Sequence, residues 1–157
     1  MSDLITTGPV AIASDHAGYD LKCVLVEHLK ALGVGVLDLG PSSADRVDYP
    51  DYGQAVGRAV VEGEAGYGIL ICGSGIGISI AANKIPGVRA ALVHDDLTAR
   101  LSRAHNDAQI VCLGSRIIGE EVARSAVTAF LSTRFEGGRH ERRVAKIHAP
   151  EQSAKND

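Results

Sequence analysis

Short apolar runs alternate with amphipathic segments along most of this chain. Each run is rich in small or branched residues and is bounded by glycine or polar residues, which is typical of a strand buried on both faces. We therefore expect strands over residues 9–14, 34–39, 68–71, 88–93 and 109–113.

The segments between these runs carry apolar residues at intervals of three and four, the period of a helix with one buried face. The clearest stripe contains Leu21, Leu25 and Leu29, and Gly33 is well placed to end that helix. A glycine hinge at 136–138 leads to a short basic amphipathic segment over 139–148. Further helices are expected over residues 50–61, 78–83, 95–106 and from 120 onward.

This alternation of strand and helix predicts a parallel sheet with helices on both faces. The expected fold class is α/β, a three-layer αβα sandwich around a five-stranded parallel Rossmann-like sheet. We find no internal repeat and predict a single domain over residues 1–149, followed by a loose polar tail over 150–157.

Composition and charge exclude some classes of function. The chain has 157 residues, 45% of them hydrophobic, and a net charge of −3, which argues against nucleic-acid or membrane-surface binding. No apolar run approaches the ~20 residues that a membrane helix needs. Three cysteines without a CxxC motif, and an N-terminus unlike a secretory signal, predict reduced thiols and a cytoplasmic protein.

Chemically active residues follow most of the predicted strands. Asp15 and His16 follow the first strand, Cys72 the third, His94 the fourth and Arg116 the fifth. Because ligands bind outside the carboxyl ends of parallel strands, we expect these residues to share one rim. For His94 we leave two roles open, a site residue and an ordinary surface residue.

A glycine-rich turn follows Cys72, with glycines at 73, 75 and 77. It is not the dinucleotide fingerprint, whose third glycine would fall at Ile78, and it lacks the Lys-Ser/Thr ending of a P-loop. A strand, a glycine turn and a helix N-terminus point backbone N–H groups at one spot, which suits a phosphate or a developing oxyanion. We favour this interpretation over a turn that only packs helix against strand.

Cys72 ends its strand beside that helix N-terminus, where a thiolate is favoured. It is therefore a candidate nucleophile or proton-abstracting base. The alternative is a small buried hydrophobic residue, which is the role we expect of Cys112.

Other candidates lie further along the chain. His105, at the end of a predicted helix, either caps helix carbonyls or serves as a general acid. Arg139 and Arg143 share one helix face and form either a solvated surface or a phosphate clamp. No two histidines have the i, i+4 spacing of a helical metal site, so we predict no metal.

Six motifs, in order, resemble the ribose-5-phosphate isomerase B family, which is grouped with allose- and galactose-6-phosphate isomerases. They are Ser14-Asp-His-Ala-Gly18, Asp48-Tyr-Pro50, Cys72 to Lys84, His105-Asn-Asp107, Gly114-Ser-Arg116 and Gly137-Gly-Arg-His140, and the resemblance covers residues 9 to 148. It implies an isomerase of sugar phosphates that needs no cofactor. It also implies a homodimer, or a dimer of dimers, with sites at the subunit interface.

The resemblance also implies roles for single residues. Cys72 would be the base that moves a proton between C1 and C2 through an enediolate. Members that use a glutamate instead carry it where this chain has Ile78. The enediolate oxygens would be stabilised by Ser74 and by the amides of Gly73, Gly75 and Gly77.

The remaining implied roles concern the ring and the phosphate. Asp15 and His105 would open the furanose ring, with Tyr49 and Asn106 lining the same pocket. The phosphate ligands would be His16, Arg116, Arg139 and Arg143, the last two on a basic segment that reaches a partner subunit.

The predicted reaction is the interconversion of ribose 5-phosphate and ribulose 5-phosphate, a step of the pentose phosphate pathway. Two alternatives stay open: isomerisation of a six- or four-carbon sugar phosphate, and a non-catalytic phosphosugar-binding domain. A thiol-dependent hydrolase with Cys72 as nucleophile ranks last, because the sequence shows no leaving-group pocket.

Overall fold

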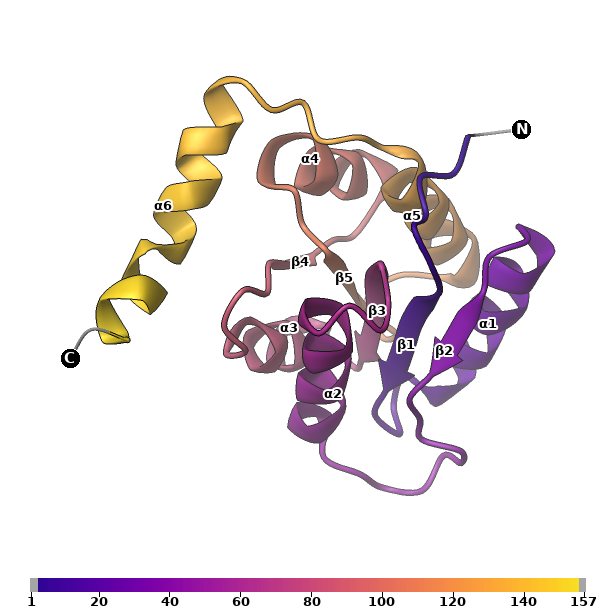
Figure 1. Cartoon of the computed structure of the whole chain (residues 1–157). Helices are drawn as coiled ribbons and strands as arrows, with labels where there is room; N and C mark the ends of the chain where they lie inside the picture. The colour runs from indigo at the N-terminus through magenta and orange to yellow at the C-terminus, as the bar shows by residue number, and fades with distance from the viewer. Residues whose placement is uncertain (1–2, 156–157) are drawn as a thin grey trace.

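A single parallel sheet forms the middle layer of the computed structural model, which describes residues 3–155 (Figure 1). Its five strands lie in the order β2-β1-β3-β5-β4. They are β1 (Val10–Ser14), β2 (Val36–Asp38), β3 (Tyr67–Cys72), β4 (Ala90–Leu92) and β5 (Ile110–Gly114). The predicted fold class is confirmed, although β2 and β4 are shorter than the apolar runs that contain them.

Helices cover both faces of this sheet. They are α1 (Tyr19–Ala31), α2 (Tyr49–Val61), α3 (Ile76–Asn83), α4 (Asp96–Asn106), α5 (Glu120–Ser132) and α6 (Arg139–Ala154). The residues expected to begin and end helices do so. Gly33, just after α1, has a φ of 74°, and a proline lies in the first turn of α2. At the start of α4, the Asp95 carboxylate accepts a hydrogen bond from the Thr98 N–H at 2.7 Å.

Alternate residues of each central strand face different helices. In β3, Ile69 and Ile71 belong to a core cluster shared with α1, α4 and α5. Leu70 and Cys72 belong to a second cluster shared with α2 and α3. Because side chains alternate across a strand, the register of β3 directs the Cys72 thiol to the α2–α3 side.

The chain leaves β1 on one side for β2 and reaches β3 on the other, so the strand order reverses between β1 and β3. The loop after β1 presses directly on β3 at this point. A Cβ at Gly18 would lie 2.6 Å from the Ile71 carbonyl oxygen, so only glycine allows this approach. The Asp15 N–H donates to the same carbonyl at 3.1 Å, which places the Asp15 side chain beside the end of β3.

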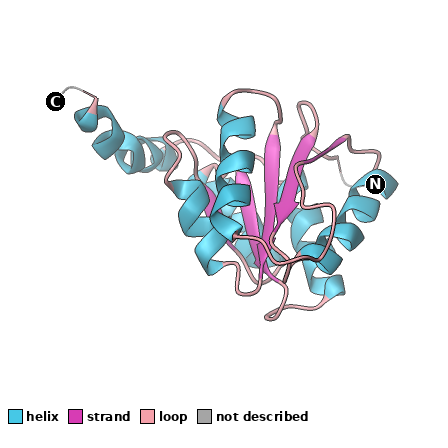
Figure 2. Cartoon of the chain, turned by 90° about the horizontal axis from the view of Figure 1, so that it is seen from below, coloured by secondary structure: helices cyan, strands magenta, loops and turns pink. Residues whose placement is uncertain are grey.

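Helix α6 leaves the body of the molecule in both views (Figures 1 and 2). Of its sixteen residues, all of them described, only His140 is buried. The predicted loose tail from residue 150 is wrong for residues 150–154, because the helix continues through Pro150 to Ala154. Residues 156–157 of that predicted tail lie outside the described residues.

A hydrogen-bond network fastens the far half of α6 to the loop before β4. The Glu151 carboxylate accepts from the Gly87 N–H at 3.1 Å and lies 3.0 Å from Nδ1 of His148. Nε2 of His148 lies 2.8 Å from Nη1 of Arg89. These contacts hold the far half of α6 against the domain and give His148 a structural role. Within residues 3–155, no helix combines the length and the apolar character that a membrane span requires.

We expect Glu151→Ala to release the last turns of α6 without unfolding the domain, since Glu151 joins the helix to Gly87 and His148. Amide hydrogen exchange should speed up by about tenfold over residues 147–155, because local opening there becomes easier. The matched control is Gln152→Ala, at an exposed position one residue along. Equal exchange in the two variants would contradict the role of the network.

Candidate active site

A hollow of about 460 Å³ opens at the carboxyl ends of β1, β3 and β5. Seven predicted site residues line it together with two isoleucines. The lining consists of Asp15, Tyr49, Cys72, Gly73, Ser74, Ile76, Gly77, Arg116 and Ile117. The rim that the sequence predicted from the strand ends therefore exists, with Asp15, Cys72 and Arg116 brought together from three separate loops.

Cys72 forms part of the floor of this hollow and is 4% exposed. The Gly75 N–H donates to its Sγ at 3.1 Å, which fixes the direction of the thiol. Gly75 has a φ of 77°, and a Cβ there would lie 2.6 Å from Cδ1 of Leu92, so both conformation and space require glycine. The chain turns at this residue, and α3 begins at Ile76.

Cys112 belongs to the same core cluster as Cys72 but does not line the hollow. It is fully buried in β5, and this burial raises the pKa of its thiol far above the usual value, with a smaller contribution from Cys72. The prediction that Cys112 serves packing is confirmed.

Ser74 completes the turn between Cys72 and α3. Its Oγ accepts a hydrogen bond from the Ile76 N–H at 3.2 Å. Since a hydroxyl that accepts a bond keeps its own hydrogen for donation, Ser74 can donate to an oxygen atom in the hollow. The turn thus offers hydroxyl and backbone donors next to the thiol.

Arg116 and Tyr49 lie against the glycine turn. The Ser115 and Arg116 N–H groups donate to the carbonyls of Cys72 and Gly73 at 2.9 and 3.0 Å, so the exit of β5 follows the turn. A Cβ on Gly73 would lie 3.3 Å from Nη1 of Arg116. Similarly, a Cβ on Gly77 would lie 2.6 Å from Cζ of Tyr49. The glycines therefore let a guanidinium and a phenol approach the backbone closely.

Asp15 and His16 follow β1 but have different surroundings. Asp15 is 6% exposed, lines the hollow, and accepts a hydrogen bond from the Gly18 N–H at 3.0 Å. His16 does not line the hollow, and its Nδ1 lies 3.2–3.3 Å from the backbone of Val47. His94 is exposed and is also absent from the lining.

Four predicted site residues lie at the other end of the strands, away from the hollow. Helix α4 runs against the strand direction, so His105 and Asn106 lie beside the amino ends of β4 and β5, where Nε of Arg89 donates to the Asn106 carbonyl at 3.0 Å. Arg139 and Arg143 lie on the first turns of α6. A strand of this length separates the two edges by about 15 Å. One chain therefore does not bring these four residues to Cys72.

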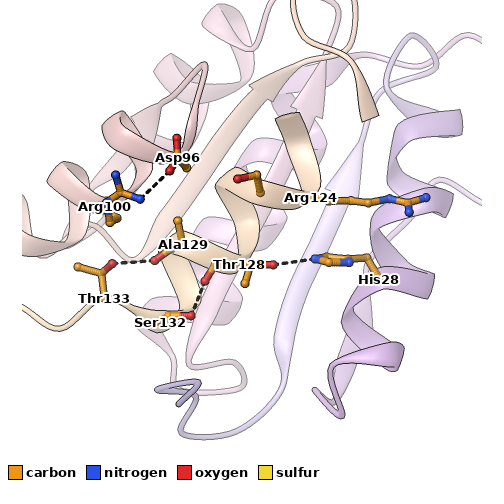
Figure 3. A pocket seen from close by; sticks show the side chains of 9 residues that line it. His28, Asp96, Arg100, Arg124, Thr128, Ala129, Ser132 and Thr133 are labelled. Carbon is orange, nitrogen blue, oxygen red and sulfur yellow. Dashed lines mark hydrogen bonds and ion pairs between the residues drawn. The ribbon is translucent and has the colours of Figure 1, made fainter. Parts of the chain in front are cut away.

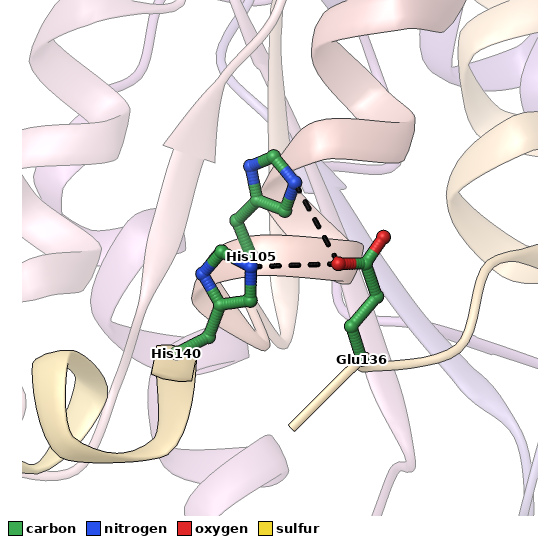
Figure 4. A group of neighbouring side chains, drawn as sticks. All are labelled: His105, Glu136 and His140. Carbon is green, nitrogen blue, oxygen red and sulfur yellow. Dashed lines mark ion pairs between the residues drawn. The ribbon is translucent and has the colours of Figure 1, made fainter. Parts of the chain in front are cut away.

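His105 belongs to a cluster that the sequence did not predict (Figure 4). Its ring stacks on His140 with centroids 4.4 Å apart and planes at 12°. Oε2 of Glu136 lies 3.4 Å from Nε2 of His140 and 3.9 Å from Nε2 of His105. Each group offers one ligand atom within 4.8 Å of the others. Stacked rings direct their in-plane lone pairs side by side and not at one point, so this geometry does not form a metal centre.

A second hollow, of about 550 Å³, runs along α5 near α1 (Figure 3). Several of its polar side chains pair with one another: His28 contacts Oγ1 of Thr128 at 2.8 Å, and Arg100 pairs with Asp96. Burial, followed by the charge of Arg124, lowers the pKa of His28. Nothing in this arrangement resembles the thiol and amide donors of the first hollow.

Sequence reasoning assigned no role to Ile117 at the first hollow, or to Glu136 and His140 in the cluster with His105. Ile117, 58% exposed, follows Arg116 at the mouth of the first hollow, and an apolar residue after a strand-end arginine was the available signal. His140 stood in a motif without an assigned role, and Glu136 was treated only as part of a hinge.

Comparison with known proteins gives consistent matches over nearly the whole chain. A family model described as Ribose/Galactose Isomerase matches residues 10–147. Ribose-5-phosphate isomerase B of Escherichia coli K12 is 49% identical over 143 residues, which is 91% of this chain and 96% of that protein. The solved ribose-5-phosphate isomerase B of Clostridium thermocellum has a TM-score of 0.92 at 48% identity, covering 93% of this chain and 99% of that one. A Mycoplasma genitalium ribose-5-phosphate isomerase B with bound ribulose-5-phosphate has a TM-score of 0.88 at 44% identity, covering 93% and 97%.

We expect Gly114→Ala to disturb the glycine turn, because its Cβ would lie 2.6 Å from the Ser74 backbone. The backbone must shift, and such overpacking costs about 1–3 kcal/mol of unfolding free energy, measurable by urea denaturation. Gly119→Ala is the matched control, since nothing lies within 4 Å of its Cβ. Equal urea midpoints for the two variants would show that the turn accommodates a Cβ at residue 114, against this prediction.

Proposed function

This chain belongs to the ribose/galactose isomerase family, and on that premise we propose that it interconverts ribose 5-phosphate and ribulose 5-phosphate. The observation that carries the proposal is the Cys72 thiol on the floor of a hollow, held by an amide donor beside a glycine turn, with Arg116 at the same hollow. A cytoplasmic location is part of the proposal and rests on the free cysteines.

In the proposed isomerisation, the Cys72 thiolate removes the proton from C2 of the open aldose. The C–H electron pair becomes the C1–C2 double bond, and the carbonyl oxygen takes up the negative charge as an enediolate. Ser74 and the amides of the glycine turn stabilise that charge, because donors fixed in advance need no reorganisation. The proton of O2 passes to O1, the C2=O bond forms from the O2 electrons, and the thiol returns its proton to C1, which yields the ketose.

The aldose enters as a closed furanose, which must open first. We assign this step to Asp15 and His105. A protonated His105 donates a proton to the ring oxygen as the bond from C1 to that oxygen breaks, and Asp15 accepts the proton of the C1 hydroxyl. The carbonyl that Cys72 needs is formed in this way, with no net change in protons.

A single chain does not place His105 next to Asp15, so we propose that each site is built by two chains. Helix α6 extends away from the body with Arg139 and Arg143 exposed, where they can reach the phosphate in a partner's hollow beside its Arg116 and His16 (Figure 2). His105 and Asn106 would enter the same hollow. Large apolar side chains around the hollow and along α3 are exposed: Ile76 (52%), Ile80 (56%) and Ile117 (58%). A second copy covering this surface would remove them from water.

Replacing Cys72 with alanine should abolish carbon-proton transfer. We expect incorporation of solvent deuterium into ribose 5-phosphate to fall by about 10²–10⁴-fold, the range for losing a general base. Cys23→Ala, at an exposed position on α1, is the control and should exchange normally. Persistent exchange in Cys72→Ala would remove Cys72 as the base. Parallel kinetics on a six-carbon sugar phosphate identifies the preferred substrate.

Mixing two inactive variants tests the shared site. A dimer that combines a Cys72→Ala chain with a His105→Asn chain would contain one intact site and one doubly altered site. Random pairing gives half heterodimers, so about a quarter of the wild-type activity should return after unfolding and refolding the mixture. A site contained in one chain predicts no recovery at all.

A further inference from the structure

We propose that Glu136 and His140 are positioning residues that keep His105 as the charged member of the stacked imidazole pair. The inference rests on the proposed function, in which a protonated His105 opens the sugar ring in a partner subunit. It adds two residues to that step and explains why His105 is the acid and His140 is not.

The cluster joins three segments at the amino edge of the sheet (Figure 4). His105 lies on the last turn of α4, His140 on the first turn of α6, and Glu136 in the segment between α5 and α6. The Glu136 N–H donates to the Ala104 carbonyl at 3.0 Å, so its backbone is fixed next to His105. Gly137 and Gly138 have φ values of 66° and 55°. This left-handed backbone brings His140 back over His105 within four residues.

Two imidazolium rings cannot both be charged at a stacking distance of 4.4 Å without strong repulsion. The helix termini decide which ring takes the proton. His105 lies at the C-terminal end of α4, where the carbonyls and the helix dipole favour a cation. His140 lies at the N-terminal end of α6, where the dipole opposes one.

Burial acts in the same direction. His140 is 5% exposed, and its Nε2 has no hydrogen-bond partner among residues 3–155, whereas the His105 side chain is 37% exposed. Burial first, then the charges of His105 and Arg139, lower the pKa of His140, and Arg143 adds to this while Glu136 opposes it. His140 therefore stays neutral and stacks as a flat ring.

The Glu136 carboxylate supplies the charge that balances the protonated ring. Its Oε2 lies 3.4 Å from Nε2 of His140 and 3.9 Å from Nε2 of His105, and because His140 is neutral the carboxylate charge acts on the protonated His105. The Glu136 carboxylate is half exposed, so solvent weakens its attraction for the imidazolium. His105 can therefore carry a proton and still release it. An acid that must give up its proton in each turnover requires this balance.

The test is Glu136→Gln, which keeps the shape of the side chain and removes its charge. Since the acid works only when protonated, turnover of ribose 5-phosphate declines as the pH rises through its titration. Without the carboxylate, turnover should be lost at a lower pH than in the wild-type protein. Glu141→Gln makes the same charge change at the residue after His140, on the first turn of α6, and should leave the pH profile unchanged.

Deuterium exchange into ribulose 5-phosphate separates ring opening from proton transfer, because the esterified O5 prevents this ketose from closing a furanose ring. Glu136→Gln should retain this exchange within about twofold while ribose 5-phosphate turnover above neutral pH falls by about tenfold. His140→Ala should lower turnover, and His140→Phe should restore most of it, since a neutral flat ring suffices. An unmoved pH profile in Glu136→Gln, or failure of His140→Phe to rescue, would overturn the inference. If wild-type protein showed neither exchange nor turnover, the proposed function itself would fail.

Discussion

The loops after β1, β3 and β5 pack closely against one another through their backbones, and the candidate site depends on this contact. Gly18, Gly75 and Gly114 each lack the space for a Cβ, with a neighbouring atom 2.6 Å from where it would lie. Side chains at these positions would hold the loops apart, and Asp15, Cys72 and Arg116 would no longer line one hollow. The chemistry of the thiol therefore rests on close packing that glycine alone permits. The amide donor on Sγ is a product of the same packing, because the turn at Gly75 creates it.

The direction of the strands imposes a second constraint. Residues after a strand and residues before it lie on opposite edges of a parallel sheet, so the loops that carry Cys72 and the helix end that carries His105 point away from each other within one chain. The two-chain site that we propose would resolve this separation. It also explains why α6 extends from the body and is fastened at both ends, by the His105–His140 stack at its start and by Glu151 and His148 near its finish. If α6 carries Arg139 and Arg143 to a second copy, as we propose, these two attachments would hold the guanidinium groups in place.

The elements whose signals are local could be predicted from the sequence. Apolar runs and three–four spacing identified the sheet and its helices, and the residues after the strands gave most of the lining of the hollow. Long-range contacts set the rest. Residues 150–154 look like a polar tail with a proline, but the contact of Glu151 with Gly87, next to that of His148 with Arg89, fastens this end of the helix to the domain. The separation of His105 from Cys72 follows from helix direction and was available in principle. The cluster of Glu136 with His105 and His140 could not be predicted from the sequence, because it depends on the backbone conformation of Gly137 and Gly138.

The choice of base is linked to the packing around it. The family resemblance places an alternative glutamate base at the position of Ile78, whose side chain here is fully buried in the cluster that contains Cys72 and Val56. A Cβ on Gly53 would lie 2.9 Å from the Ile78 carbonyl oxygen, so α2 also presses on this turn of α3. A carboxylate at position 78 would have to lie among apolar side chains or push α2 aside, and either change costs several kcal/mol. A thiol needs no such accommodation, because it packs like a small apolar group while protonated and reacts only where an amide and a hollow meet it. The proposed base Cys72 and the buried Ile78 are therefore linked by packing, and a single substitution at residue 78 would not supply a glutamate base without disturbing α2 and α3.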